Sequence, residues 1–345
     1  MDRIREAVRE LVGVFRSAPS KHEANRAAGP ILEQLTRHPA FLTAVLEKYL
    51  TSRGVLDRRN YPVVGMEIAS NPWFGLVANC WIPLPGRETH LSTKAIHHHG
   101  NMLLSTATLF GPGYEHWMFT PPKELDRERG LYEMDLLEAA PHPRHHVSFV
   151  DAWVAHTPFY PKELSITLAL WSNRFDTTWR DHLKRLPGVS QNANLLRDVA
   201  VKMGMRKALD LKVVESYDFF PTAEGFQVMR ERKEFELGPN EDHLHSVFHV
   251  VQRTGNEHLG RVIRRQLARG AGASARPTIE RLLDDLERGR PIDGRLSSMH
   301  HGIPYANFTR EDVLRALRAL GKKVDDGGKF APAPGGQEAA RASAH

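Results

Sequence analysis

A run of short β-like stretches in residues 55–172 constrains the fold of this chain more than any other feature. The stretches are rich in aromatic and β-branched residues, and prolines and glycines separate them. The strand pattern occurs in residues 74–82, 93–104, 116–119, 147–156 and 164–171. Many short strands without helices between them are typical of a β-sandwich or a small barrel. The sequence therefore predicts a mainly β core.

Helical patterns flank this core on both sides. Apolar residues recur at helical spacing in residues 1–54 and again in residues 238–322. We assign residues 55–237 to the β core, with a helical insertion at about 175–210, and expect a disordered tail at 323–345. The N-terminal helices are expected to cover the core or to contact a second copy in a homodimer.

The composition excludes several classes of protein. The chain has 345 residues, of which 41% are hydrophobic and 26% charged, as in an ordinary globular protein. No apolar run approaches the roughly 20 residues of a membrane helix, and the first residues lack the apolar core of a signal peptide. Cys80 is the one cysteine, so no internal disulfide can form, and we expect a cytoplasmic protein. The net charge is +6, but the basic residues are scattered and interleaved with acidic ones, so we expect no nucleic-acid partner.

The chain carries 19 histidines, and three of them are consecutive in the segment AIHHHG. Side chains alternate between the two faces of a strand, so His97 and His99 point the same way and His98 points the other way. Two imidazoles at this spacing inside a barrel can bind one metal ion. A third ligand must then come from another strand.

His156 is the best candidate for the third ligand, because it ends one strand-like stretch and precedes another. His145 and His146 are rivals, and His146 shares the strand parity of His156. Three neutral imidazoles suit Fe(II), and also zinc, copper or nickel. They leave coordination positions open, as catalytic metal sites do.

The order of strand, H-x-H, glycine-containing turn, strand and distant histidine resembles the cupin superfamily. Within it, residues 58–172 resemble the cysteine dioxygenase group of thiol dioxygenases. The residues that carry this resemblance are Tyr61, Phe74-Gly75-Leu76, Cys80-Trp81, His97-His98-His99, Leu109-Phe110 and Gly113. The resemblance implies a small β-barrel or jelly roll of the cupin type, Fe(II) on three histidines, and O2 activation.

The match departs from that group in three places. Positions 101–104, where the common cupin motif has a glutamate, hold no carboxylate, which favours a three-histidine site. The group uses an arginine near its first tyrosine to bind a substrate carboxylate, and here only Arg58 and Arg59 lie near Tyr61. Its Ser-His-Tyr relay corresponds to residues 167, 169 and 171, which are Thr, Ala and Trp. A cysteine substrate is therefore not expected.

Tyr114, Glu115 and His116 follow a Gly-Pro-Gly turn and are expected near the mouth of the site, with Glu115 or His116 as general base. The leading hypothesis is an Fe(II)-dependent, dioxygenase-like oxygenase that acts on a small polar organic substrate with O2. One alternative is a lyase or isomerase that uses the metal as a Lewis acid. Another is a non-catalytic ligand sensor.

A second histidine group lies in the helical segment EDHLHSVFHVVQ, at positions 243, 245 and 249. His245 and His249 are four residues apart and share a helix face, as in helix-borne zinc sites, but no HExxH pattern is present. We interpret them as a partly exposed helix face, and leave open whether they approach the barrel.

Overall fold

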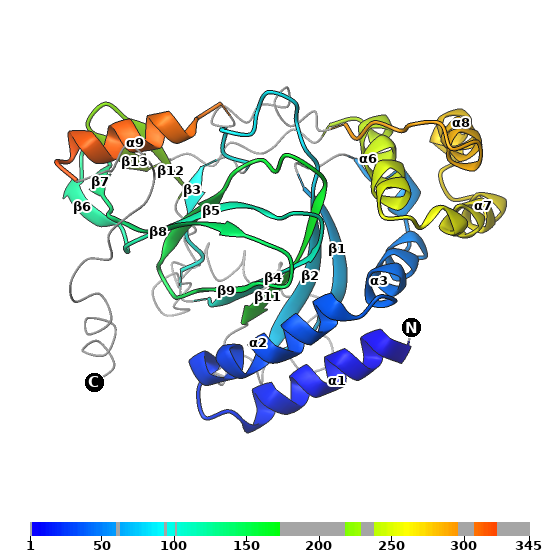
Figure 1. Ribbon diagram of the computed structural model, residues 1–345, viewed down its shortest axis with the longest axis horizontal. Helices are drawn as coiled ribbons and strands as arrows, with labels where there is room; N and C mark the ends of the chain where they lie inside the picture. The colour runs from blue at the N-terminus through cyan, green and yellow to red at the C-terminus, as the bar shows by residue number, and fades with distance from the viewer. Residues whose placement is uncertain are drawn as a thin grey trace, which may run out of the picture.

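The computed structural model describes residues 2–59, 63–92, 95–100, 102–172, 218–228, 238–295 and 307–322. Two β-sheets surround the centre of the molecule (Figure 1). Helices α1 and α2 lie along one side of the sheets, α6 to α8 lie at one end, and α9 lies at the opposite end. Every strand pair within the two sheets is antiparallel.

The first sheet has five strands. In spatial order they are β1 (Val64–Ser70), β2 (Phe74–Trp81), β11 (Ser165–Ser172), β4 (Leu104–Phe110) and β9 (Val147–Val150). The second sheet has eight strands. In spatial order they are β6 (Lys123–Asp126), β7 (Leu131–Glu133), β13 (Gly225–Val228), β12 (Asp218–Thr222), β3 (Ile96–His97), β10 (Ala155–Pro158), β5 (Tyr114–Phe119) and β8 (Leu136–His142).

The strand pairing is that of a jelly roll. Strand β2 pairs with β11, β3 with β10, β4 with β9, and β5 with β8, so the chain forms nested pairs that alternate between the sheets. Jelly-roll barrels are built from two such four-stranded sheets. This topology confirms the predicted mainly β fold with a cupin-type, jelly-roll core. The remaining strands only extend its two sheets.

Helices precede and follow the β core along the chain, as predicted. The α-helices are α1 (Asp2–Ser17), α2 (Lys21–Arg37), α3 (Phe41–Leu50), α6 (Asn240–Arg253), α7 (Gly260–Ala268), α8 (Arg276–Glu287) and α9 (Arg310–Ala319). Short 3-10 turns occur at Val55–Asp57, Glu257–Leu259 and Ala273–Ala275. None of these helices is long and apolar enough to cross a membrane.

The apolar outer faces of the two sheets explain where the helices lie. Outward-facing residues of the first sheet, such as Leu168 and Leu170, share one hydrophobic cluster with α1–α3 and α6–α8. Trp117 and Phe119 of the second sheet share another cluster with Val313 and Leu317 of α9. Thr309 caps α9 in a capping box with Asp312, as its sequence predicts.

Some predicted elements differ from the structure. The strand expected at 93–104 is confined to Ile96–His97, and a separate strand, β4, begins at Leu104. The strand expected at 147–156 is two strands, β9 and β10, which belong to different sheets. The helical insertion at 175–210 and the tail at 323–345 lie outside the described residues. The domain bounds, the cytoplasmic location and the homodimer stay predictions.

Candidate metal centre

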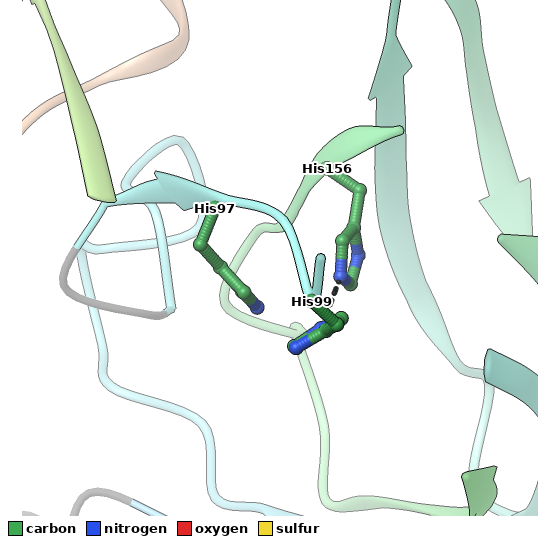
Figure 2. Close-up of side chains that lie close together, drawn as sticks. All are labelled: His97, His99 and His156. Carbon is green, nitrogen blue, oxygen red and sulfur yellow. Dashed lines mark hydrogen bonds between the residues drawn. The ribbon is translucent and has the colours of Figure 1, made fainter. Parts of the chain in front are cut away.

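His97, His99 and His156 converge between the two sheets (Figure 2). One nitrogen of each ring lies within 4.8 Å of a nitrogen of both other rings. Strand pairing produces this convergence, because His97 of β3 is in register with His156 of β10. His99 follows β3 in a loop, where Gly100 has a φ of 61° and helps the chain to leave the sheet. These are the residues that the sequence singled out.

The spacing of the rings suits a shared cation. Nε2 of His99 lies 2.8 Å from Nε2 of His156. Two nitrogen ligands about 2.1 Å from a metal, at right angles to each other, lie about 3 Å apart. Nδ1 of His97 lies 3.3 Å from the carbonyl oxygen of Ala95 and can donate to it, which leaves Nε2 as the metal-binding atom.

His116 fixes the orientation of His156. Nε2 of His116 lies 2.8 Å from Nδ1 of His156. When Nε2 of His156 binds a metal, its proton is on Nδ1 and is donated to His116. Metal-binding histidines commonly have such a partner on the second ring nitrogen. His116 therefore lies beside the centre, buried on the inner face of β5 rather than at the mouth of the site.

Burial keeps His99, His116 and His156 neutral. Desolvation, with the neighbouring His97 and His98 as a smaller cause, lowers the pKa of His99 to about 2. Desolvation likewise lowers the pKa of His116 to about 3 and holds that of His156 well below its usual value. Neutral imidazoles keep a free lone pair at pH 7, so the site can bind a metal without first losing protons.

His98 points away from the other two members of the triplet. Its Nδ1 accepts a hydrogen bond of 3.0 Å from the backbone N–H of Gly100. Its ring lies 5.4 Å from that of Trp153 and 6.0 Å from that of Phe219. The alternation expected from strand geometry therefore holds, although the regular strand ends at His97.

A buried polar network lies deeper in the barrel. Thr106 and Thr108 contact the two ring nitrogens of His142 at 2.7 and 3.1 Å. Tyr114 hydrogen-bonds to Thr106 and Thr167, and desolvation raises its pKa. The indole of Trp81 donates to Thr167 at 2.9 Å. His142 was not singled out from the sequence, because its threonine partners lie on another strand more than thirty residues away.

Glu115 does not lie with the histidines. It accepts a hydrogen bond of 2.6 Å from the indole N–H of Trp117 and forms an ion pair with Arg310 of α9. Tyr114 and His116 face inward, so Glu115 faces outward by strand alternation. The structure gives no support to the expected role of Glu115 as a general base.

The rival histidines lie elsewhere. Nδ1 of His145 contacts Thr36 of α2 at 2.9 Å, and exposed His146 packs against His142. The α6 histidines, at positions 243, 245 and 249, contact Tyr49, Arg281 and the carbonyl of Ile292 respectively. The interpretation of a partly exposed helix face is wrong for positions 243 and 245, which are buried, and only position 249 is partly exposed. Within the described ranges, the barrel triad is the one group with the geometry of a metal site.

The structure describes most of the positions at which the sequence differs from the cysteine dioxygenase group. Thr167, Ala169 and Trp171 occupy alternate positions of β11, whereas Tyr61 lies outside the described residues. The guanidinium of Arg58 lies 5.2 Å from the centre of the Tyr49 ring, and Arg59 donates to the carbonyl of Gly238. These contacts direct both arginines toward the helical side of the molecule.

No protein-family model matches this chain, and no curated protein matches its sequence. Solved structures resemble part of it. A protein with a double-stranded β-helix domain from Klebsiella pneumoniae is 11% identical with a TM-score of 0.20, and the match covers 34% of this chain and 85% of that chain. A cupin domain from Bordetella pertussis Tohama I is 8% identical with a TM-score of 0.20, covering 34% and 98%.

A sugar phosphate isomerase of the cupin superfamily from Silicibacter pomeroyi is 9% identical with a TM-score of 0.22, covering 35% of this chain and 63% of that chain. Two of these three structures are described as cupins. Because the TM-scores are low, the fold assignment rests on the strand pairing described above, and these likenesses assign no activity to this chain. The resemblance to the cysteine dioxygenase group stays a prediction.

Proposed function

We propose that this chain is a metal-dependent enzyme, an oxygenase that holds Fe(II) on His97, His99 and His156. The observation that carries the proposal is the convergence of three imidazoles inside a jelly-roll core. Three protein ligands leave further coordination positions open, which is typical of catalytic rather than structural sites. When bound, Fe(II) would supply the capacity to activate O2 beside a coordinated organic substrate.

The protein's own residues would orient and enclose the reacting groups. His116 fixes the tautomer and ring direction of His156 through their 2.8 Å hydrogen bond. Since Nε2 of His116 accepts this hydrogen bond, His116 would act as a positioning residue for His156. Tyr114, on the same face of β5, is fixed by Thr106 and Thr167 and would limit how deep a substrate can reach.

Turnover under controlled oxygen tests the oxygenase proposal. The protein, loaded anaerobically with Fe(II), is supplied with candidate substrates, and O2 consumption is followed with an electrode. We expect substrate-dependent O2 consumption that is lost in the His97→Ala variant and retained in His98→Ala. Product formation at the same rate without O2 would contradict the oxygenase proposal and would favour the lyase or isomerase alternative, in which the metal acts as a Lewis acid.

A further inference from the structure

Apolar side chains lie beside the candidate metal ligands at the same level of the barrel. Across the first sheet, Leu104 is in register with both Trp171 and Val150. Across the second sheet, His156 is in register with Met118 as well as with His97. Leu104, Val150 and Ala169 form a hydrophobic cluster against which Met118, Val154 and Trp171 pack. This cluster therefore joins the two sheets at the level of the histidines.

The apolar wall lies directly beside the candidate ligands. The ring of Trp171 lies 4.3 Å from that of His99, edge to face. Trp171, Met118 and Val154 are partly exposed, as are His97 and His99, whereas Tyr114, His142 and their threonine partners are buried. A molecule that approaches the histidines from solvent would therefore meet the apolar side chains, and the polar network beneath is already paired with itself.

The charge around this wall disfavours an anionic group. No lysine or arginine is buried among the described residues, so none of them offers an enclosed cation to a carboxylate or a phosphate. Glu138, in register with Met118 on the neighbouring strand, is exposed. Its negative charge would repel a second negative charge at this end of the barrel.

We propose that the substrate joins a metal-binding head to an uncharged apolar body, aryl or alkyl, that packs against Trp171 and Met118. This inference rests on the metal centre of the proposed function and replaces the small polar substrate suggested by the sequence. Burial of apolar surface against an aromatic side chain would supply the affinity. Trp171 and Met118 would determine specificity without touching the reacting bond.

Hydroxamates of graded size test the proposal, because they share one chelating head. The protein is loaded with Co(II), and binding is followed by the change in the visible spectrum of the metal. We expect benzohydroxamate and hexanohydroxamate to bind about tenfold or more tightly than acetohydroxamate, after correction for their binding to Co(II) in water. The six-carbon hydroxamate that ends in a carboxylate should lose that advantage.

Variants locate the apolar contact. Trp171→Ala should abolish most of the difference in affinity between benzohydroxamate and acetohydroxamate, and Trp171→Phe should restore it. Met118→Ala is a second variant at the same wall. Trp73→Ala is the matched control, because Trp73 packs against the helical cluster outside the barrel and should keep the wild-type difference.

The outcomes separate the inference from the metal site. Equal affinities across the series, or tighter binding of the carboxylate-ended probe, would overturn the apolar substrate and leave the metal centre standing. The apolar substrate would also be overturned if the difference in affinity between benzohydroxamate and acetohydroxamate survives in both Trp171→Ala and Met118→Ala. If Co(II) does not bind, or if no hydroxamate changes the spectrum, the metal centre fails and the inference fails with it.

Discussion

The molecule contains two groups of histidines that look alike in sequence and differ in arrangement. In the barrel, His97 and His99 come from one segment and His156 from another, and the three rings meet at one point. On α6, His245 and His249 are one helical turn apart, yet each contacts a different group, Arg281 and the carbonyl of Ile292. Desolvation lowers the pKa of histidines in both groups.

The difference shows what a metal site requires beyond density of histidine. On a helix, the spacing of four residues brings two side chains to one face, but a third ligand has to come from a neighbouring element. In the barrel, the register of β3 with β10 supplies that ligand. Neighbouring strands place side chains about 5 Å apart, close enough for both to reach one ion. We expect the barrel group to bind a metal and the α6 group not to.

Removal of one barrel ligand should have the largest effect. We predict that His156→Ala lowers metal affinity by more than about a hundredfold, since even partners behind the ligands commonly contribute ten- to a hundredfold. His249→Ala is the matched control on α6 and should leave affinity unchanged. Competition with a coloured chelator measures both. Equal losses in the two variants would break the distinction between the groups.

A smaller loss is predicted for the residue that orients His156. His116→Leu removes the partner of Nδ1 and should weaken metal binding about ten- to a hundredfold without emptying the site. His116→Asn, whose amide oxygen can accept the same hydrogen bond, should recover part of the affinity. His146→Ala, on the exposed side of the barrel, is the control. Unchanged affinity in His116→Leu would show that the hydrogen bond does not position the ligand.

Acid should destabilise the metal-free protein through one buried histidine of the barrel, His142, and one of α6, His243. Desolvation lowers the pKa of His142 and of His243 to about 4, below the usual value of 6.5. Between pH 4 and pH 6.5 the unfolded chain binds more protons than the folded protein. The contribution of each histidine to the stability of the fold is therefore complete above pH 6.5 and is lost as the pH falls toward 4. Each should add about 1.4 kcal/mol per pH unit to the slope of the unfolding free energy in that window.

Urea unfolding at several pH values measures that slope. His243→Gln should reduce the slope between pH 6.5 and 4, because its side chain does not titrate there. Saturating Co(II) should bind only at the barrel site. It should therefore raise the urea midpoint of unfolding of the wild type and of His243→Gln alike. A slope unchanged in His243→Gln would show that this histidine can take up a proton in the folded protein without penalty.

The smallest effect is predicted for the hydrogen bond on α6. Nδ1 of His249 lies 2.7 Å from the carbonyl oxygen of Ile292 and ties α6 to the segment that follows α8. His249→Ala should lower the free energy of unfolding by about 1–3 kcal/mol through the lost hydrogen bond. Metal content should stay that of the wild type. A loss of metal in this variant would mean that α6 supports the barrel site.

The sequence predicted the features that depend on local periodicity. The strands around Leu76, Trp117 and Leu168 were evident from their apolar and β-branched residues. The opposite directions of His98 and its two neighbours followed from strand alternation alone. His156 could be chosen as the third candidate because it stands between two strand-like stretches, although the structure places it within β10, beside β3.

Other features depend on pairing between distant segments, which the sequence does not show. His142 is buried among threonines of β4, and nothing near it in the chain indicates that partnership. Glu115 was proposed as a base because it follows the Gly-Pro-Gly turn, but its partner Arg310 lies 195 residues further along. Strand parity was the available signal: if His116 faces inward, Glu115 faces outward.

Metal content of the purified protein tests the central claim most directly. The chain is prepared without an affinity tag of histidines, and the wild type, His97→Ala and His98→Ala are measured by elemental analysis after exposure to Fe(II) under anaerobic conditions. We predict one metal ion per chain in the wild type and in His98→Ala, and none in His97→Ala. A wild type without bound metal, or a site emptied by His98→Ala and not by His97→Ala, would contradict the account.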